Sequence, residues 1–598
     1  MRSSLKNVEI YKKEGRRIAR GTGRNKPVKI RDIKEMMKDT VEKYSEHVAF
    51  KYKKEGRLVK KTFSDFEQDV NALGTKLINM GLKDEKVAII GGNSYKWSVS
   101  YMAVLNGVGV VVPLDKSLPQ VEIENLINRS GVKAIFYSKD YQEIMENIAS
   151  KMDIIDYYIS LDEKDLTKDH FLSFDSLVEE GKKLLSDGDR SYIDVIIDTQ
   201  KMSVLLFTSG TTKKSKGVML SHRNLASNIE SLTGVIRFNT KDVHLSLLPI
   251  HHTFENTIGF LFMFHEGACI AYCEGIRHIA SNLKEFDVTI LLAVPAIYEV
   301  MYEKIIEGLK KSGKEKLVNV MMKLSNILCS CGIDVRKKML KAVIDNIAPN
   351  IRLMVSAAAP IDKKIIKFFS SLGIVFFQGY GLTETSPLVA VNTEDNLKIG
   401  TVGPPGYNIE VAIDNPDENG MGELLVKGEN VMLGYYDNSD NENIFTHDGW
   451  FKTGDIAIID EDGLLKITGR EKSMIVFTNG KKAFPEEYEE MLNKIKGVKE
   501  SFVWGDKSKE GAVQICAKIV IDENQDEKGL LDLVEMRIKE INKDLPQYKI
   551  IRYFVLTKKE LVKTTTLKIK RNIEISHMND YLEKNNCNMR KLNRSIIQ

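Results

Sequence analysis

The stretch Leu205 to His222, LLFTSGTTKKSKGVMLSH, places glycines, hydroxyl side chains and lysines between two apolar runs. Glycine lets a ligand approach the backbone closely, hydroxyl groups donate hydrogen bonds, and lysines add positive charge. These residue types together predict a cradle for an anion, with phosphate as the best candidate. The spacing between Gly210 and Gly217 does not fit GxxxxGK[ST], so a kinase-type phosphate loop is disfavoured. A polar turn between two buried strands is the alternative that this stretch alone leaves open.

Four further motifs follow the first along the chain. They are SAAAP at 356–360, GYGLTETSP at 379–387, GWFKTGDIAIIDEDGLLKITGR at 449–470 and LVKTTTLKIKR at 561–571. With TSGTTKKSKG, they resemble the ordered motifs of the acyl-adenylate-forming superfamily, which includes acyl-CoA synthetases, adenylation domains and luciferases. The resemblance spans roughly residues 35 to 575. It depends on five motifs in the family's order, and no single motif would be decisive.

The resemblance implies a set of residues that bind ATP. Ala357 and Ala358 would lie against the adenine, and Tyr380 would pack on its ring. Asp455 would accept hydrogen bonds from both ribose hydroxyls, and Arg470 would contact ribose and phosphate. The residues implied to wrap the β- and γ-phosphates are Thr208, Ser209, Gly210, Thr211, Thr212, Lys216 and Gly217.

The resemblance also implies a reaction in two halves. A carboxylate attacks the α-phosphorus of ATP and pyrophosphate leaves; the thiol of CoA then attacks the acyl-adenylate and AMP leaves. Thr383 would reach the α-phosphate, and Glu384, with Thr211, would help to hold Mg²⁺, which favours hard carboxylate oxygens. Lys568 would be the catalytic lysine, on a domain that rotates about Lys472.

Three positions where the family usually has glycine or proline carry other residues here. Lys213 stands where the family usually has glycine, Ser215 where it usually has proline, and Leu567 where a glycine precedes the catalytic lysine. The added charge suits a triphosphate, whereas the lost glycines make the loops stiffer. An inactive relative that only binds nucleotide or a partner is therefore one alternative function.

The acid substrate is predicted from two further segments. LPIHHTFENTIG at 248–259 and LLAVPAIYE at 291–299 resemble long-chain fatty acyl-CoA synthetases, with His252 near the substrate carboxylate and Ala296 in place of an arginine. The run GFLFMFHEGACIAY that follows is rich in Phe and Met, which suits an alkyl chain and equally suits a helix core. We therefore expect a medium- to long-chain fatty acid-CoA ligase, with an acyl carrier protein as the alternative acceptor.

These motifs need a large scaffold, and the chain supplies one. Its 598 residues predict more than one domain. Short β-branched strands such as KVAIIGGN and GVGVVVPLD alternate with helical segments, which indicates βαβ units and a parallel sheet, while helical spacing covers about Ile33 to Met80. We expect an α/β fold, with a large multi-sheet body and a small mobile α+β C-terminal domain. The predicted divisions are a basic N-terminal arm (1–34), an ATP- and acyl-binding domain (35–470), a small domain (471–577) and a polar tail (578–598).

Charge and composition set the remaining expectations. The net charge of +4 is close to balance for this length, so charge gives no reason to expect nucleic acid. The six cysteines have no zinc-site spacing, which predicts reduced thiols. The start MRSSLKNVEIYKKEGRRIAR lacks the apolar core of a secretory signal, which favours a cytoplasmic protein. Its basic residues predict a solvated flexible arm, or else peripheral contact with an anionic membrane.

Overall fold

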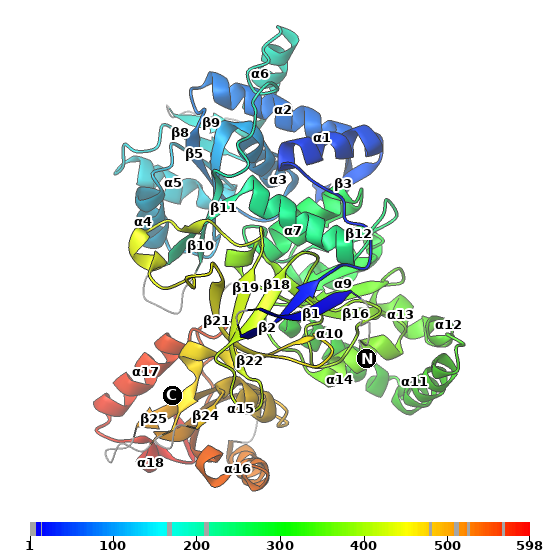
Figure 1. Cartoon of the computed structure of the whole chain (residues 1–598), viewed down its shortest axis with the longest axis vertical. Helices are drawn as coiled ribbons and strands as arrows, with labels where there is room; N and C mark the ends of the chain where they lie inside the picture. Colours follow the sequence, from blue (N-terminus) through cyan, green and yellow to red (C-terminus); the bar gives the residue numbers. More distant parts are fainter. Residues whose placement is uncertain are drawn as a thin grey trace.

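The computed structural model has a large body followed by a small C-terminal domain (Figure 1). The structure describes residues 7–13, 15–163, 170–208, 215–477, 481–507, 513–522, 527–564 and 568–597. Within these ranges the body contains two eight-stranded sheets and one six-stranded sheet, and the small domain is built on a four-stranded sheet. The predicted α/β class, with a multi-sheet body and a smaller C-terminal domain, is confirmed. The mobility of that domain stays a prediction.

The strands of the body form three sheets, each described from one edge to the other. Sheet 1 contains β20 (Gly434–Tyr435), β11 (Lys216–Ser221), β10 (Met202–Thr208), β6 (Gly109–Leu114), β5 (Glu85–Ile90), β7 (Ala134–Tyr137), β8 (Tyr157–Ser160) and β9 (Phe171–Ser173). Sheet 2 contains β17 (Leu388–Val391), β16 (Val375–Gly381), β15 (Leu353–Ser356), β14 (Ile290–Ala293), β12 (Val243–Ser246), β13 (Cys269–Tyr272), β3 (Val48–Lys54) and β4 (Arg57–Thr62). Sheet 3 contains β1 (Val8–Lys13), β2 (Arg16–Gly21), β18 (Glu410–Asp414), β19 (Gly422–Lys427), β21 (Phe451–Ile459) and β22 (Leu465–Arg470).

Helices cover and separate these sheets. The α-helices of the body are α1 (Ile33–Tyr44), α2 (Phe63–Asn79), α3 (Tyr95–Ala103), α4 (Gln120–Ser130), α5 (Gln142–Ala149), α6 (Phe174–Ser186), α7 (His222–Val235), α8 (Met263–His265), α9 (Ile279–Glu285), α10 (Pro295–Lys311), α11 (Glu315–Ser330), α12 (Arg336–Met339), α13 (Lys341–Ile347) and α14 (Lys363–Ser371). Two segments are π-helical, η1 (Val104–Val108) and η3 (Phe254–Phe262). Short 3-10 turns are η2 (Lys139–Tyr141), η4 (Ile276–His278), η5 (Thr383–Thr385), η6 (Asn438–Asn441) and η7 (Glu471–Ser473).

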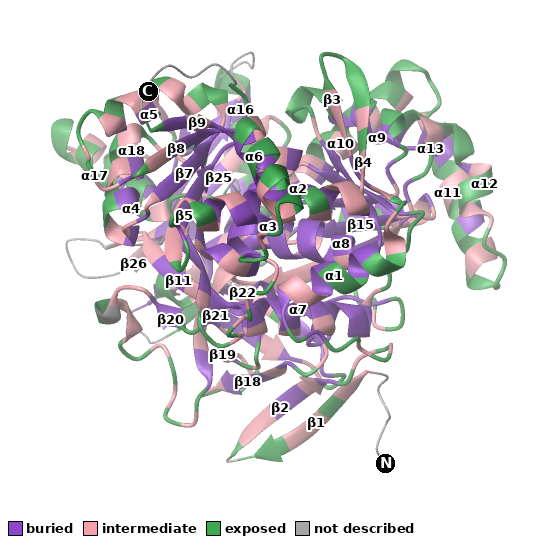
Figure 2. Ribbon diagram, turned by 90° about the horizontal axis from the view of Figure 1, so that it is seen from above, coloured by how far each residue is buried: buried purple, intermediate pink, exposed green. Residues whose placement is uncertain are grey.

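Sheets 1 and 2 are each buried on both faces. One continuous apolar core joins their facing sides through α1, α2, α3 and α7, and includes Phe50 of sheet 2 and Val111 of sheet 1. The outer face of sheet 1 packs on α4 and α5, and the outer face of sheet 2 on α9, α10, α13 and α14. Figure 2 shows the resulting continuous buried interior. Continuous apolar strands such as VAII in β5 are typical of parallel sheets covered by helices on both sides.

The small domain has its own core and sheet. Its strands are β25 (Val498–Lys507), β26 (Val513–Ile521), β27 (Ile551–Thr557) and β28 (Ser595–Ile597), beside the two-stranded β23 (Ile475–Val476) and β24 (Lys482–Ala483). Its helices are α15 (Pro485–Leu492), α16 (Glu527–Lys543), α17 (Arg571–Lys584), α18 (Met589–Leu592) and the turn η8 (Gln547–Lys549). In Figure 1 this domain lies below the body, beside the ends of β21 and β22.

Some expectations for the two ends of the chain are wrong. Residues 8–13 and 16–21 are not a flexible arm, because they form β1 and β2 at the edge of sheet 3. Arg16 pairs there with Asp448 at 2.6 Å, and Tyr11 donates to Glu410 at 2.7 Å. The tail is not simply a polar surface segment either, since β28 extends the sheet of the small domain beside β27. The structure does not support the predicted membrane contact through the arm, because charges such as that of Arg16 are paired within the protein.

The predicted helical stretch from 33 to 80 contains a hairpin. Strands β3 and β4 pair between α1 and α2, and they place Phe50 in the core. In the described part of the chain, no helix is both long enough and apolar enough to cross a membrane. The domain boundaries proposed from sequence stay predictions, although β22 ends at Arg470, where the predicted body also ends.

Candidate active site

The carboxyl ends of neighbouring parallel strands bring most of the motifs together. Strands β12, β14, β15 and β16 are adjacent and parallel in sheet 2. The segment with His252 follows β12, the VPAIYE segment follows β14, and SAAAP follows β15. GYGLTE forms the end of β16 and the turn η5. Ligands of open α/β sheets bind outside the carboxyl ends of the strands. The carboxyl ends of these four strands are therefore the expected ligand-binding site.

Asp455 connects sheet 3 to the carboxyl ends of the strands in sheet 2. Its side chain is almost fully buried, with 4% exposed, and it lies opposite Arg470 in the β21–β22 pair. One carboxylate oxygen is 3.0 Å from Arg470 Nε, and the other accepts a hydrogen bond of 2.5 Å from the Tyr380 hydroxyl. Burial, and then the Asp455 charge, raise the pKa of Tyr380 well above its usual value. Three residues predicted separately to bind adenosine are therefore in direct contact.

A second polar group joins the predicted metal ligand to the phosphate loop. The Tyr435 hydroxyl donates to Glu384 Oε1 at 2.8 Å. The Lys216 ammonium lies 4.3 Å from the centre of the Tyr435 ring and 3.3 Å from Asp440 Oδ1. Thr383 and Glu384 share the turn η5, so Tyr435 links that turn to Lys216 at the start of β11. Sequence reasoning missed Tyr435 and Asp440; only the YY of GYYDNSD hints at a packed aromatic beside the loop.

The predicted phosphate-binding segment begins in β10 and ends in β11, and these two strands pair antiparallel to each other. Thr208 pairs with Lys216 across the two strands, and Gly217 follows in β11. Four of the predicted phosphate ligands, Ser209, Gly210, Thr211 and Thr212, lie outside the described residues, as does Lys213. Their predicted roles, including that of Thr211 toward Mg²⁺, stay predictions.

Ser215, the residue in place of the usual proline, is held from two sides. Its hydroxyl donates to Glu122 at 3.1 Å, and its carbonyl accepts from Arg129 Nη2 at 2.9 Å. Arg129 also pairs with Asp437 at 2.6 Å. These bonds fix the end of the loop without the restricted backbone that proline would supply. Glu122, Arg129 and Asp437 carry no signal in the sequence that would have revealed this role.

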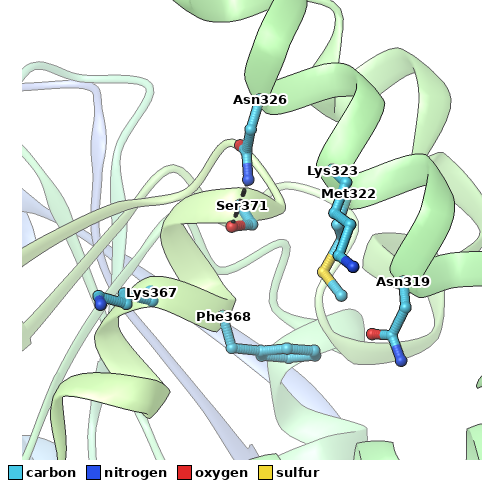
Figure 3. A pocket seen from close by; sticks show the side chains of 7 residues that line it. All are labelled: Asn319, Met322, Lys323, Asn326, Lys367, Phe368 and Ser371. Carbon is cyan, nitrogen blue, oxygen red and sulfur yellow. Dashed lines mark hydrogen bonds between the residues drawn. The ribbon is translucent and has the colours of Figure 1, made fainter.

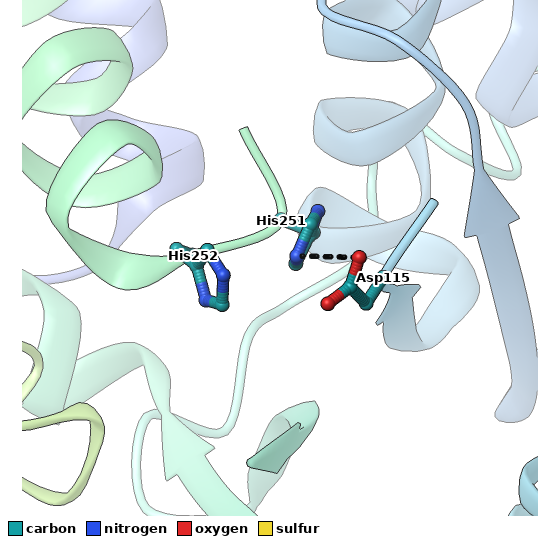
Figure 4. A group of neighbouring side chains, drawn as sticks. All are labelled: Asp115, His251 and His252. Carbon is teal, nitrogen blue, oxygen red and sulfur yellow. Dashed lines mark ion pairs between the residues drawn. The ribbon is translucent and has the colours of Figure 1, made fainter. Parts of the chain in front are cut away.

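His252 lies in a cluster with His251 and Asp115 (Figure 4). Asp115 follows β6 of sheet 1, so the cluster joins the edges of sheets 1 and 2. The centres of the two imidazole rings are 4.2 Å apart, and His251 Nε2 is 3.6 Å from Asp115 Oδ1. Burial, assisted by His251, lowers the pKa of His252 to about 3. His252 is therefore a neutral imidazole at neutral pH.

Lys568 is carried by a narrow hairpin of the small domain. The Thr564 N–H donates to the Lys568 carbonyl at 2.8 Å, and the Lys568 N–H donates back to Thr564 Oγ1 at 3.1 Å. The base of the hairpin is held where the Val562 N–H donates to Glu574 at 2.8 Å, and Glu574 pairs with the buried Lys518 at 2.8 Å. Leu567 lies outside the described residues.

The hairpin brings Lys568 into electrostatic range of charged groups of the body. The residue is exposed to solvent, yet enough protein surrounds it for desolvation to lower the pKa of its ammonium. Arg470 lowers that pKa further, while the charges of Asp455 and Glu384 oppose the shift. Lys568 in turn acts electrostatically on His252. The small domain therefore places Lys568 within reach of charged groups from sheets 2 and 3.

The remaining predicted residues have more local roles. Ala357 and Ala358 follow β15, and Ala358 adopts a left-handed backbone with φ of 74°. In VPAIYE, the Tyr298 hydroxyl donates to the carbonyls of Leu291 and Val355, which ties β14 to β15.

The Phe-rich run belongs mainly to the core, since Phe260 and Phe264 are buried against Phe50 and Phe66. It therefore gives no separate support for an alkyl pocket.

Glu384 fits the magnesium that the motif implies. One of its oxygens accepts from Tyr435, and within the described ranges the other accepts no hydrogen bond. Mg²⁺ usually binds one or two carboxylates together with substrate phosphates, so a single carboxylate connected through Tyr435 to Lys216 is sufficient. Lys472 lies in the turn η7 that follows Arg470, at the passage from sheet 3 to the small domain.

Comparison with known proteins agrees with this geometry. Residues 37–436 match the AMP-binding enzyme family, and residues 472–584 match the AMP-binding enzyme C-terminal domain. The chain belongs to the AMP-binding enzyme family, and the predicted superfamily resemblance is confirmed.

Three relatives illustrate its range. The chain is 26% identical over 557 residues to the Arabidopsis thaliana chloroplastic long-chain-fatty-acid--[acyl-carrier-protein] ligase AEE15, covering 81% of this chain and 76% of the relative. It is 28% identical over 487 residues to long chain acyl-CoA synthetase 4 of Arabidopsis thaliana, covering 76% and 72% of the two chains. The structure of the anthranilate CoA ligase AuaEII with anthranoyl-AMP superposes with a TM-score of 0.72, at 18% identity, over 92% of this chain and 98% of that one. The last comparison shows the fold alone.

Replacing Asp455 by Ala tests the ribose contact. Two ribose hydroxyls would lose a charged acceptor, and each such hydrogen bond contributes about 1.5 to 3 kcal/mol. We expect the affinity for Mg·ATP, measured by titration calorimetry, to fall at least about tenfold. Asp462→Ala, with 51% of its side chain exposed in the turn between β21 and β22, is the matched control. Normal ATP binding by a folded Asp455→Ala protein would show that the ribose lies elsewhere.

Proposed function

We propose that the protein is an AMP-forming ligase that activates a medium- to long-chain fatty acid as its acyl-adenylate and transfers the acyl group to CoA. The observation that carries this proposal is the position of Lys568, from the small domain, within electrostatic range of Asp455, Glu384 and His252 of the body. A nucleotide-binding module without catalysis would not require this arrangement. The long-chain relatives support a fatty acid as the substrate.

The proposed first half-reaction joins the carboxylate to the α-phosphorus and releases pyrophosphate. The Lys568 ammonium would contact the acyl carboxylate and the α-phosphate, holding the nucleophile in place and offsetting the negative charge that develops on oxygen. Thr383 would donate to the α-phosphate. Lys216 would exchange its contact with Asp440 for the terminal phosphates. Mg²⁺ held by Glu384 would supply further neutralisation of the triphosphate charge.

His252 has a restricted role in this chemistry. Its neutral imidazole can donate one hydrogen bond to the acid substrate, but it carries no charge to offer at neutral pH. We infer that it orients the carboxyl group while Lys568 supplies the charge. Asp115 and His251, which accompany it, would then fix the position of its ring.

In the proposed second half-reaction, the sulfur of CoA attacks the acyl carbonyl carbon, the thioester bond forms, and the bond to AMP breaks. The small domain would first turn about the region of Lys472, removing Lys568 and admitting the thiol. A carrier protein bearing a phosphopantetheine thiol is the second candidate acceptor. It is favoured specifically by the similarity to an acyl-carrier-protein ligase over most of the chain.

Product analysis tests the substrate and the acceptor together. The protein would be incubated with Mg·ATP and acids from acetate to C18, with either CoA or holo acyl carrier protein, and the thioesters quantified by mass spectrometry. Each buried CH₂ contributes about 0.8 kcal/mol, so we expect kcat/KM to rise by orders of magnitude from acetate to a twelve-carbon acid. Equal turnover of acetate or an aromatic acid would contradict the fatty acid assignment. If the thioester forms only on the carrier protein, the carrier protein and not CoA is the acyl acceptor.

Replacing Lys568 by Ala separates the two half-reactions. We expect fatty acid-dependent ATP/pyrophosphate exchange to fall by at least about 10² to 10³, the effect of removing one preorganised charged group. Conversion of supplied acyl-AMP and CoA into acyl-CoA should stay near normal, because the turned domain no longer presents this lysine. Lys570→Ala, two residues along the same exposed segment, is the control. Intact exchange in Lys568→Ala, with loss in Lys570→Ala or in Lys563→Ala, would move the catalytic assignment to another lysine.

A further inference from the structure

Helix α11 presents a row of large apolar side chains to solvent. Leu317, Val320, Leu324 and Ile327 are each at least half exposed, with fractions from 50% to 62%. Their spacing of three and four residues places them within about 80° of one another on a helix of 3.6 residues per turn. Single exposed apolar residues are normal on protein surfaces, but four aligned on one helix mark an interaction surface. We call these four residues the α11 stripe.

The α11 stripe is separate from the face that holds the helix to the body. Val318 and Ser325 are buried, and Met321 and Met322 pack against the outer core of sheet 2. Helix α11 therefore has one apolar face turned inward and a second turned outward. In Figures 1 and 2, α11 and α12 project from the body on the side away from α17 and α18. A partner bound to the stripe would leave the small domain uncovered.

Positive charge lies along one side of the α11 stripe. The segment 310–341 contains nine basic residues but only Glu315 and Asp334 as acids, whereas the whole chain has a net charge of only +4. Lys316 and Lys323 lie on α11 next to the stripe, and neither has an acidic partner among the residues described. Three of the nine are ion-paired: Lys311 with Glu307, Arg336 with Asp334 and Lys341 with Asp345. The charge available to an anionic partner therefore comes from the other lysines, such as Lys316 and Lys323.

A hollow of about 320 Å³ lies along the other side of these lysines, between α11 and α14 (Figure 3). It is lined by Met322 and Phe368, and by Lys323 from α11 and Lys367 from α14. Asn326 donates to Ser371 at 2.8 Å across it, which holds the two helices together. Around the circumference of α11, the α11 stripe is therefore followed by the lysines, and the lysines by the hollow.

We propose that α11 docks on the surface of a membrane containing anionic phospholipids. The α11 stripe would enter the boundary between headgroups and acyl chains, and Lys316, Lys323 and Lys367 would contact phosphate groups. A helix lying in the interface combines a narrow apolar face with flanking lysines, which is the arrangement of α11. Its 16 residues, about 24 Å long, lie along the surface and do not span it. This proposal concerns binding alone and does not require the proposed ligase activity.

Several features favour a lipid surface over a protein partner. The stripe runs along a single exposed helix, and the charged groups beside it are lysines, whose long stems can reach outward while apolar surface is buried. A protein groove would have to accept a helix that is already packed against the body by Val318 and Met322. A bilayer accepts such a half-exposed helix without any shape requirement.

Vesicle co-sedimentation of the full chain tests the proposal. The vesicles would contain phosphatidylcholine alone or with about 30% phosphatidylglycerol. We expect binding to the anionic vesicles and at least tenfold weaker binding to the neutral ones. The stripe variant Leu317→Ser, Val320→Ser, Leu324→Ser, Ile327→Ser should bind anionic vesicles at least tenfold more weakly. The variant Lys316→Glu, Lys323→Glu should lose the preference for phosphatidylglycerol, since each lysine near an anionic surface contributes about 1 kcal/mol, or about fivefold.

A matched control uses apolar residues of similar or greater exposure elsewhere. Leu58→Ser, Val121→Ser, Ile196→Ser and Ile276→Ser change four side chains with exposed fractions from 48% to 91%, and this combined variant should bind as the wild type does. Circular dichroism and the urea midpoint confirm that every variant is folded. The proposal is overturned if the wild type ignores anionic vesicles, or if the folded stripe variant binds them normally. It is also overturned if the stripe residues instead support a dimer in size-exclusion chromatography or hold an acidic carrier protein.

Discussion

The contact of the Asp455 carboxylate with Tyr380 and Arg470 connects the parts of the protein on which the proposed site depends. It joins the end of β16 in sheet 2 to the β21–β22 pair in sheet 3, at the point where the chain leaves the body for the small domain. A buried carboxylate needs such partners, because removing one leaves charge uncompensated in a region of low dielectric. The same interaction therefore stabilises the junction between the two sheets and fixes the position of the Asp455 carboxylate, which is proposed to bind ribose.

The rest of the site follows from the arrangement of sheets around that junction. Sheet 2 contributes the turn with Glu384, sheet 1 contributes the hairpin that ends at Lys216, and Tyr435 lies between them. The small domain adds Lys568 on a hairpin whose base is fixed by Glu574 and Lys518. The proposed chemistry would take place where the ends of these elements meet. This division suits a reaction in which one domain must change position between two steps.

The motif residues could be predicted from the sequence because glycine, hydroxyl and charged side chains at fixed spacings have few structural alternatives. The two βαβ-rich sheets were also predictable from short apolar strands. The β3–β4 hairpin was not, because lysines dominate KYKKEGRLVKK and its core residues are few. The N-terminal hairpin was missed because its stabilising contacts are remote in sequence. Arg16, for example, pairs with Asp448, which is more than four hundred residues further along the chain. Tyr435, Asp440 and Arg129 escape prediction for the same reason, since their roles exist only after distant strands have paired.

A crystal structure of the protein with ATP and Mg²⁺ tests the central interaction most directly. We predict that both ribose hydroxyls lie within hydrogen-bond distance of the Asp455 carboxylate, which keeps its contact with Arg470, while the Tyr380 ring packs against adenine. The triphosphate should then extend toward Lys216. A nucleotide whose ribose makes no contact with Asp455, or that occupies another part of the surface, would contradict the proposed site.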